Sequence, residues 1–384
     1  MKSNVDRLII KEFQNKYQIS PKYLISAPGR VNLIGEHTDY SEGFVLPVAI
    51  NLSIYIAMSP SESQIVDVYS MDYDERIDFH LKKLKKNNDN WEKYIKGVAW
   101  AMLDEGIDLN GWNAVMTGNI PIGAGLSSSA ALEVAVVKAF CLSGSYSLSP
   151  VSIAEISKKA ECSWVGVNVG IMDQLISAAG RQGHAMKLDC RTKQMEYVPI
   201  PSGISFFVLD TMTRRELSNS DYNTRHEEVI SASRILGVSL LRDATLDQLA
   251  GKKATLPDTL YRRAKHVITE NLRVHAFSQA MRRSDLIEMG KLINKSHASL
   301  RDDFQVSSKE LNLIVNIAQN DPACLGARMT GAGFGGCALA VIKDKNTDAF
   351  IRNVSNVYSD ETGLKANIFK VNSAQGVAAK HLNL

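Results

Sequence analysis

The sequence predicts an α+β protein built from two domains. Segments typical of strands occur between segments with the 3.6-residue apolar repeat of helices. The chain has 384 residues, a length that suits about two domains or one large one. The pattern becomes mostly helical a little after residue 200. We therefore expect one domain over residues 1–200 and a second over residues 201–384.

Composition excludes several classes of protein. The chain is 45% hydrophobic and 22% charged, and its net charge is only +3. That charge is too small to indicate a nucleic acid or an anionic membrane as partner. No apolar run approaches the ~20 residues of a membrane span, and the first residues carry charges where a signal peptide is uncharged. The five cysteines form no CxxC pair, which is typical of reduced thiols, so we expect a cytoplasmic protein.

Strands and helices are mixed in the first half of the chain. The segment 91–106 is predicted to be helical, because its apolar residues recur at i, i+3, i+4 and i+7 and Gly106 supplies a stop. A helix over about 129–140 follows a glycine loop. Another begins with Ser149 as cap and Pro150 in its first turn. Strands are predicted at 23–29, 44–58, 64–70 and 111–118.

The second half opens with strands and then becomes helical. Residues 184–189 and 194–200 flank a short polar turn and predict a hairpin. The nearly continuous apolar run 204–210 is typical of a strand buried on both faces. Helices are expected up to about residue 320. A strand, a glycine loop and a strand follow over 326–344, and a helix and the strand 365–371 close the chain.

The loop "PIGAGLSSSAALEVA", residues 121–135, suits phosphate. Small residues expose backbone N–H groups, and the N-terminus of the helix that follows adds positive potential. The loop is neither a GxxxxGK[ST] loop nor part of a protein-kinase motif set. A glycine-rich turn that only leads into a core helix stays open as an alternative.

A second glycine loop, "GAGFGG" at residues 331–336, matches GxGxxG. Dinucleotide binding requires a helix directly after such a loop, but "CALAVI" reads as a strand. We therefore reject a nicotinamide dinucleotide site. A loop of this kind is expected to pack closely against another backbone or a ligand.

Two further segments carry polar side chains. Arg30, Glu36, His37 and Asp39 lie within "APGRVNLIGEHTDY". Carboxylates accept several hydrogen bonds, so the cluster suits neighbouring hydroxyl groups, although an exposed polar loop is an equal alternative. Asp173 lies in the otherwise apolar "VGIMDQLISAAG", where a carboxylate must be paired, exposed or functional.

These four segments, in this order, resemble the GHMP small-molecule kinases, and among them the galactokinase family. "GRVNLIGEHTDY" resembles the galactokinase signature, "PIGAGLSSSAALEVA" the phosphate loop, "GIMDQ" the catalytic-aspartate segment and "MTGAGFGGCALA" the third motif. The resemblance covers nearly the whole chain. It implies an N-terminal domain like domain 2 of ribosomal protein S5, a ferredoxin-like C-terminal domain, and an active site between them.

The resemblance also implies a role for each matching residue. The catalytic pair would be Asp173 and Arg30. Sugar contacts would come from Glu36, His37, Thr38, Asp39, Gly170 and Tyr222. Contacts to ATP would come from Ser70, Gly123, Ala124, Gly125, Leu126, Ser127, Ser128 and Ser129. Magnesium ligands would be Ser129 and Glu161. Trp91 and Tyr94 would line the adenine pocket, or they belong to the core face of their helix.

The implied reaction is phosphorylation of D-galactose by ATP with Mg²⁺, giving galactose 1-phosphate and ADP in galactose catabolism (the Leloir pathway). Asp173 would orient the anomeric hydroxyl and accept its proton late, since phosphoryl transfer is loose. Related kinases of N-acetylgalactosamine, arabinose or galacturonate are alternatives. So is a non-catalytic galactose sensor, but such proteins lack the Ser-Ala step that Ser129 and Ala130 supply. We expect a monomer, and a dimer stays open.

Overall fold

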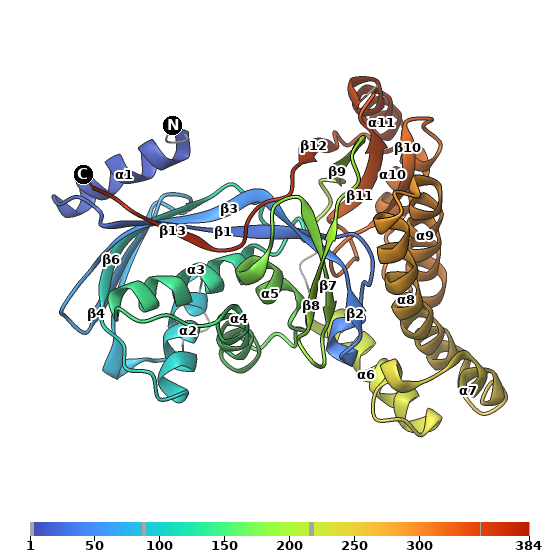
Figure 1. The fold of residues 1–384 in the computed structure, drawn as a ribbon, viewed down its shortest axis with the longest axis horizontal. Helices are drawn as coiled ribbons and strands as arrows, with labels where there is room; N and C mark the ends of the chain where they lie inside the picture. The colour runs from blue at the N-terminus through green and yellow to red at the C-terminus, as the bar shows by residue number, and fades with distance from the viewer. Residues whose placement is uncertain (1–3, 87–89, 215–218, 346, 384) are drawn as a thin grey trace.

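The computed structural model describes residues 4–86, 90–214, 219–345 and 347–383, and its strands form three sheets (Figure 1). The largest has six strands in the order β13 (Ala378–His381), β1 (Tyr23–Asn32), β3 (Pro47–Pro60), β6 (Trp112–Gly118), β4 (Ile65–Ser70) and β5 (Glu75–His80). All neighbours are antiparallel except β4 and β6, which run parallel. β13, from the end of the chain, thus completes a sheet that is otherwise built from the first third.

Helices cover both faces of this sheet. On one face, Ile9, Ile10 and Phe13 of α1 (Asn4–Tyr17) pack against β-strand residues that include Leu24 and Val115. On the other face lie α2 (Glu92–Asp104), α3 (Ser128–Ser143), α4 (Pro150–Lys159) and α5 (Met172–Ala179) (Figure 1). α3 is central to the core, because it is apolar on all sides and most of its residues are buried.

The second half forms a four-stranded antiparallel sheet covered by helices. Its order is β10 (Cys324–Met329), β11 (Cys337–Lys343), β9 (Ile204–Asp210) and β12 (Asn367–Val371). The helices of this half are α6 (Asn219–Leu236), α7 (Leu246–Gly251), α8 (Asp258–Arg282), α9 (Leu286–Ser299), α10 (Lys309–Gln319) and α11 (Thr347–Thr362). A small sheet of β2 (Phe44–Val45), β7 (His184–Asp189) and β8 (Met195–Pro199) lies between the two halves (Figure 1).

The predicted elements are confirmed in kind and order, with small differences at their ends. The hairpin of β7 and β8 forms, and β9 is an inner strand with a nearly wholly buried run. The Ser149 hydroxyl caps α4 by accepting a hydrogen bond from the Ser152 N–H. The sequence analysis did not predict α1, β5, α5 or β13, and the strand expected over 44–58 is divided into β2 and β3. The domain boundary at residue 200 stays a prediction.

Within the described part of the chain, every helix is too short or too polar to cross a bilayer. None of the five cysteines forms a disulfide.

Candidate active site

The four motifs meet around one cavity of about 540 Å³. Its lining comes from the end of β1 and the loop after it, the start of α2, the glycine loop and the start of α3, the segment 161–170 between α4 and α5, the starts of α5 and α6, and the loop after β10. Side chains or backbone of these segments that line it include Arg30, Glu36, His37, Asp39, Gly123, Gly125, Leu126, Ser127, Ser128, Ser129, Glu161, Gly170, Asp173, Tyr222 and Gly331.

Arg30 and Asp173 form a two-pronged ion pair in this cavity. The Arg30 Nε donates to Asp173 Oδ1 at 2.8 Å, and Nη2 donates to Oδ2 at 2.8 Å. The third guanidinium nitrogen, Nη1, donates to the Gly125 carbonyl at 2.6 Å. The Ser127 hydroxyl donates to the same aspartate. One arginine therefore links the carboxylate to the glycine loop, and both groups are held before any ligand enters.

The glycine loop leads into α3 as predicted, and its backbone is strongly curved. Gly123 and Gly125 have φ values of +69° and +75°, which favour glycine. Two other segments press on the loop. The Arg30 N–H donates to the Leu126 carbonyl at 3.1 Å, and a Cβ on Gly331 would lie 3.0 Å from the Gly125 carbonyl oxygen.

The second glycine loop therefore packs against the first, as its composition predicted. β11 follows this loop directly, which confirms that no dinucleotide-type helix is present there. Of the predicted ATP contacts in this loop, Leu126 lines the cavity although it is almost wholly buried, whereas Ala124 is fully buried and does not line it. The contact of Ala124 with ATP stays a prediction.

Ser129 and Glu161, the predicted magnesium ligands, lie next to each other. The Ser129 hydroxyl donates to Glu161 Oε1 at 2.9 Å, and Gln174 donates to Oε2 at 2.6 Å. Burial, together with the charge of Asp173, raises the pKa of Glu161 to about 7. Among the described residues no group of three or more His, Cys, Asp or Glu side chains could hold a metal ion. One hydroxyl and one carboxylate fit Mg²⁺, which takes most of its ligands from phosphates and water.

The sugar-contact candidates gather beside Asp173. Asp39 packs so closely on Gly170 that a Cβ there would lie 1.9 Å from Asp39 Oδ2. Burial raises the pKa of Asp39 to about 6, and the neighbouring Asp173 and Glu36 carboxylates add to the effect. Tyr222 lies next to His37, with ring centroids 5.7 Å apart.

His37 is held as a neutral imidazole. Its Nδ1 lies 3.1 Å from the Tyr40 hydroxyl and its Nε2 lies 3.1 Å from the Ala332 carbonyl. The carbonyl can only accept, so Nε2 carries the hydrogen and Nδ1 accepts from the tyrosine. Burial, together with the nearby His266, lowers the pKa of His37 to about 3.

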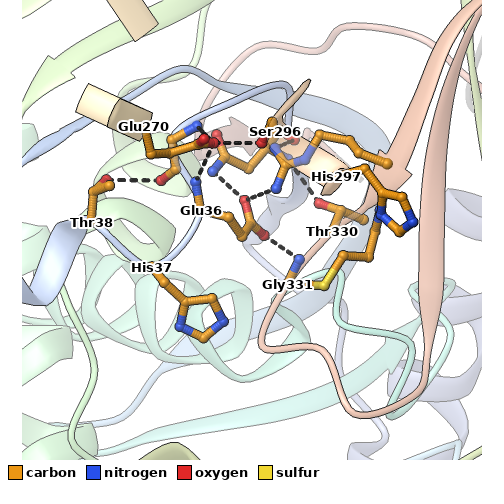
Figure 2. A network of polar contacts seen from close by, with 12 residues as sticks. Glu36, His37, Thr38, Glu270, Ser296, His297, Thr330 and Gly331 are labelled. Atoms are coloured by element: carbon orange, nitrogen blue, oxygen red, sulfur yellow. Dashed lines mark hydrogen bonds and ion pairs between the residues drawn. The ribbon is translucent and has the colours of Figure 1, made fainter. Parts of the chain in front are cut away.

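Glu36 and Thr38 hold the polypeptide together rather than point freely into the cavity (Figure 2). The Glu36 carboxylate accepts from the Gly331 N–H and the Asn32 amide and pairs with Arg328 Nη2 at 2.9 Å. The Thr38 hydroxyl bridges two carbonyl oxygens at 2.8 and 2.9 Å. Their predicted contacts with the sugar stay predictions.

A second cavity, of about 770 Å³, adjoins the glycine loop. Ser128, Ser129, Trp91 and Tyr94 line it, and Trp91 stacks on Tyr73 with ring centroids 6.0 Å apart. Trp91 is also buried against the core, so both of its predicted roles are compatible with its position. Ser70 is fully buried and lines neither cavity. Its contact with the nucleotide stays a prediction.

The sequence analysis overlooked several residues around the site. Glu133 is fully buried on α3 near Gln174, and burial together with Glu161 raises its pKa well above the usual range. The available signal was that Glu133 is the one acidic residue of the largely apolar α3. Lys93 and Asn223 also line the cavity that contains Arg30 and Asp173.

Three family models match the chain. The galactokinase galactose-binding signature matches residues 11–60, the GHMP kinase N-terminal domain residues 93–181 and the GHMP kinase C-terminal domain residues 277–360. The chain is 41% identical to a galactokinase of Roseiflexus sp. (strain RS-1), over 96% of this chain and 95% of that protein. It is 39% identical to a galactokinase of Actinobacillus succinogenes, over 95% and 97%.

Solved structures agree with these matches. The crystal structure of Lactococcus lactis galactokinase complexed with galactose superposes with a TM-score of 0.94 at 31% identity, over 98% of this chain and all of that one. A mevalonate kinase of Methanococcus jannaschii shares the fold, with a TM-score of 0.66 at 18% identity over 92% and 98% of the two chains. The two-domain GHMP architecture expected from the sequence is confirmed.

Proposed function

The chain belongs to the galactokinase family of the GHMP kinases, and on this premise we propose that it transfers the γ-phosphoryl group of ATP to D-galactose. The acceptor is the anomeric hydroxyl, and the products are galactose 1-phosphate and ADP. The observation that carries the proposal is the Arg30–Asp173 pair, because it lies where the sugar-signature loop and the phosphate loop share one cavity.

The glycine loop binds the nucleotide phosphates with its main chain. Its left-handed glycines and the N-terminus of α3 present N–H groups, and the helix dipole favours a negative charge there. The cavity lined by Trp91 and Tyr94 adjoins this loop and takes the base. Phosphoryl transfer depends mainly on such positioning and on neutralised charge.

Asp173 accepts a hydrogen bond from the anomeric hydroxyl and orients it towards the phosphorus atom. Because Arg30 donates to both carboxylate oxygens, the Asp173 side chain is fixed in one orientation. The hydroxyl proton passes to the carboxylate late, as the new O–P bond forms. Arg30 stays beside the transferred group and stabilises its charge.

Mg²⁺ is expected as the metal cofactor, with Ser129 and Glu161 as the protein groups that hold it. When bound, the ion neutralises charge on the ATP phosphates. Gln174 fixes the orientation of the Glu161 carboxylate for this role.

The Asp39 carboxylate accepts hydrogen bonds from the sugar hydroxyls. Both ring nitrogens of His37 already have protein partners, so the imidazole contacts the sugar through its ring and not through a hydrogen bond. A sugar epimer that leaves such a buried group unpaired loses about 1–3 kcal/mol, and more at a charged group. We expect kcat/KM for galactose to exceed that for glucose by at least ~10³.

A coupled ADP-release assay tests the function on a panel of sugars. The panel holds galactose, glucose, 2-deoxygalactose, N-acetylgalactosamine, arabinose and galacturonate, and phosphorus NMR identifies the product. Galactose should give the highest kcat/KM and a 1-phosphate. A higher kcat/KM for another sugar, or no turnover of galactose, contradicts the proposal.

We further expect the protein to act in the cytoplasm as a monomer, without nucleic acid or membrane partners. Light scattering after gel filtration should give a mass near 42.3 kDa. A mass of twice that value contradicts the monomer.

A further inference from the structure

Side chains of helix α8 form hydrogen bonds with the backbone of the sugar loop, which we define as residues 35–44. The Glu270 Oε1 accepts hydrogen bonds from the Gly35 N–H at 2.9 Å and the Glu36 N–H at 3.4 Å. His266, one turn earlier on the same helix, lies with its Nε2 3.0 Å from the Glu36 carbonyl. Both side chains are fully buried, so the start of the loop has fixed partners instead of water. Figure 2 shows Glu270 beside the start of the loop.

The same helix also holds the other end of the loop. Asn271 Oδ1 accepts from the Phe44 N–H at 2.8 Å. A Cβ on Gly43 would lie 2.5 Å from that oxygen, so the backbone must approach the helix closely here. His37 and Asp39 thus lie between two points fixed on α8.

Glu270 is itself held as a buried anion. Ser296 of α9 donates to its Oε1 at 2.6 Å, and Arg273 Nε donates to its Oε2 at 2.6 Å. Burial opposes ionisation, but Arg273, His266 and Arg328 keep the pKa of Glu270 far below its usual range. An ionised acceptor makes stronger hydrogen bonds to N–H groups than a neutral one.

The phosphate loop has its own supports. Arg30 and Gly331 contact the phosphate loop directly. The hydrogen bonds from the Glu270, His266 and Asn271 side chains to loop backbone go to the sugar loop and not to the phosphate loop. A change at Glu270 should therefore affect galactose binding, through the sugar loop, more than ATP binding.

We propose that Glu270 is a positioning residue for galactose, which fixes the sugar loop on α8 and thereby sets the places of His37 and Asp39. This inference rests on the proposed function of the cavity. It assigns a sugar-specific role to a side chain that does not line the cavity.

Steady-state kinetics of Glu270→Gln test the proposal. The amide keeps the size of the side chain and one oxygen for Gly35, but it loses the charge and presents an N–H₂ group to a donor. Weakening a hydrogen bond to a charged group by 1.4 kcal/mol corresponds to about a tenfold change. We expect the KM for galactose to rise about tenfold and the KM for ATP to stay within about twofold.

The matched control is Asp258→Asn, the same chemical change on the exposed start of α8, where the side chain is 83% exposed. Both KM values should be unchanged there. Ser296→Ala serves if Glu270→Gln does not fold, because it removes one donor and keeps the charge. It should raise the KM for galactose about two- to threefold and leave the KM for ATP unchanged.

Equal rises in both KM values, or a loss of kcat alone, would overturn the positioning role and leave the proposed function intact. A wild-type protein that does not phosphorylate galactose would instead remove the proposed function. Its turnover is therefore measured first.

Discussion

Asp173 has two partners that fix its orientation. Arg30 donates to both of its oxygens, and the Ser127 hydroxyl donates to one of them. A carboxylate held by so many donors is a well-oriented acceptor. Orientation is what a loose phosphoryl transfer needs most.

Asp173→Asn should lower kcat by about 10³-fold or more, since the amide presents either a donor or a single neutral oxygen to the sugar hydroxyl. ATP binding should persist, because the phosphate loop keeps its backbone. Calorimetric titration with ATP and the ADP-release assay measure the two effects. A variant that keeps a tenth of the wild-type kcat would remove Asp173 from the chemistry.

Asp39 gives the site a pH dependence. Burial and the nearby carboxylates raise its pKa to about 6, so the free site takes up a proton as pH falls through that value. The protonated group loses most of its strength as an acceptor for sugar hydroxyls. At saturating MgATP, kcat/KM for galactose should fall as pH drops from 7 to 5.

Asp39→Asn is the comparison for this titration. Its kcat/KM should be low at all pH values and should lack the step near pH 6. The His37 imidazole does not contribute a step there, because burial and His266 lower its pKa to about 3. Glu161, whose pKa burial raises to about 7, adds a separate decline at higher pH, and that decline should persist in Asp39→Asn. A step of the same size in the variant would assign the titration to another group.

For single residues, the sequence indicated which side chains belong to the site but not which residues they contact. The alternatives for Asp173 included a paired carboxylate, and the pairing with Arg30 exists, but nothing local shows that residues 143 positions apart meet. Glu36 is the clearest case. Its type suits a sugar contact, yet its two oxygens face Gly331, Asn32 and Arg328, and two of these lie in the second half of the chain.

At the scale of elements, the sugar loop and the segment before α5 can make close contact because Gly170 has no side chain. Gly170 leaves the space that the Asp39 carboxylate fills. Gly170→Ala should therefore displace Asp39 and raise the KM for galactose at least about tenfold, by loss of a charged hydrogen-bond partner. The KM for ATP should change little.

Gly251→Ala is a suitable comparison, because a Cβ at Gly251 meets nothing within 4 Å and its backbone is not in the left-handed region. It should leave both KM values as they are. An unchanged KM for galactose in Gly170→Ala would mean that Asp39 does not contact the sugar.

The glycine loop before α3 allows a similar comparison for ATP. Gly125 and Gly106 share a φ of +75°, so valine is strained at either position. At Gly106 a Cβ meets open space, whereas at Gly125 it lies 3.4 Å from the Thr330 carbonyl and beside the phosphate cavity. Both variants should lower the melting temperature, but only Gly125→Val should weaken ATP binding, and more than galactose binding.

Calorimetry with the two ligands separates these outcomes. A loss for galactose alone in Gly125→Val, or an equal loss for both ligands, contradicts the assignment of the loop to phosphate. A loss of ATP binding in Gly106→Val would show that strain, and not the position of the side chain, is responsible.

The overlooked elements differ in how much local pattern they carry. β13 has mostly polar or exposed residues and exists because β1 offers it an edge. In α1, by contrast, Ile9, Ile10 and Phe13 recur at helical spacing and pack against strands that follow later in the chain. The sequence therefore contained enough pattern to predict α1 but not β13.

For the whole molecule, the order of the four motifs predicted that they share a site, but not how the two halves are joined. The sugar loop follows β1, yet it is held by α8 and by the loop after β10. The last strand returns to pair with β1. Such contacts are set by tertiary packing, which no local pattern of the sequence contains.

The pair of Glu36 with Arg328 is the buried junction between the halves. The two side chains are 3% and 0% exposed, and Arg328 also donates to the Asn32 carbonyl at 3.1 Å. Removing one partner of a buried pair leaves an uncompensated charge, which typically costs 3–5 kcal/mol. Arg328→Met should therefore lower the free energy of unfolding by about 3–5 kcal/mol, measured by urea denaturation. Arg301→Met, at an arginine that is 47% exposed, should change it by less than about 0.5 kcal/mol.

Adding Glu36→Gln to Arg328→Met should recover part of the lost stability, because the unpaired charge disappears with it.

The same double variant tests whether a change at this ion pair affects the binding of both ligands. Glu36 holds the Gly331 N–H, and Gly331 packs on the Gly125 carbonyl, so this junction reaches the phosphate loop as well as the sugar loop. We therefore expect the double variant to weaken ATP and galactose together, in contrast to the galactose-specific effect of Glu270→Gln. A double variant less stable than Arg328→Met alone would show that Glu36 stabilises the fold without its arginine. A loss confined to one ligand would show that the junction does not couple the two loops.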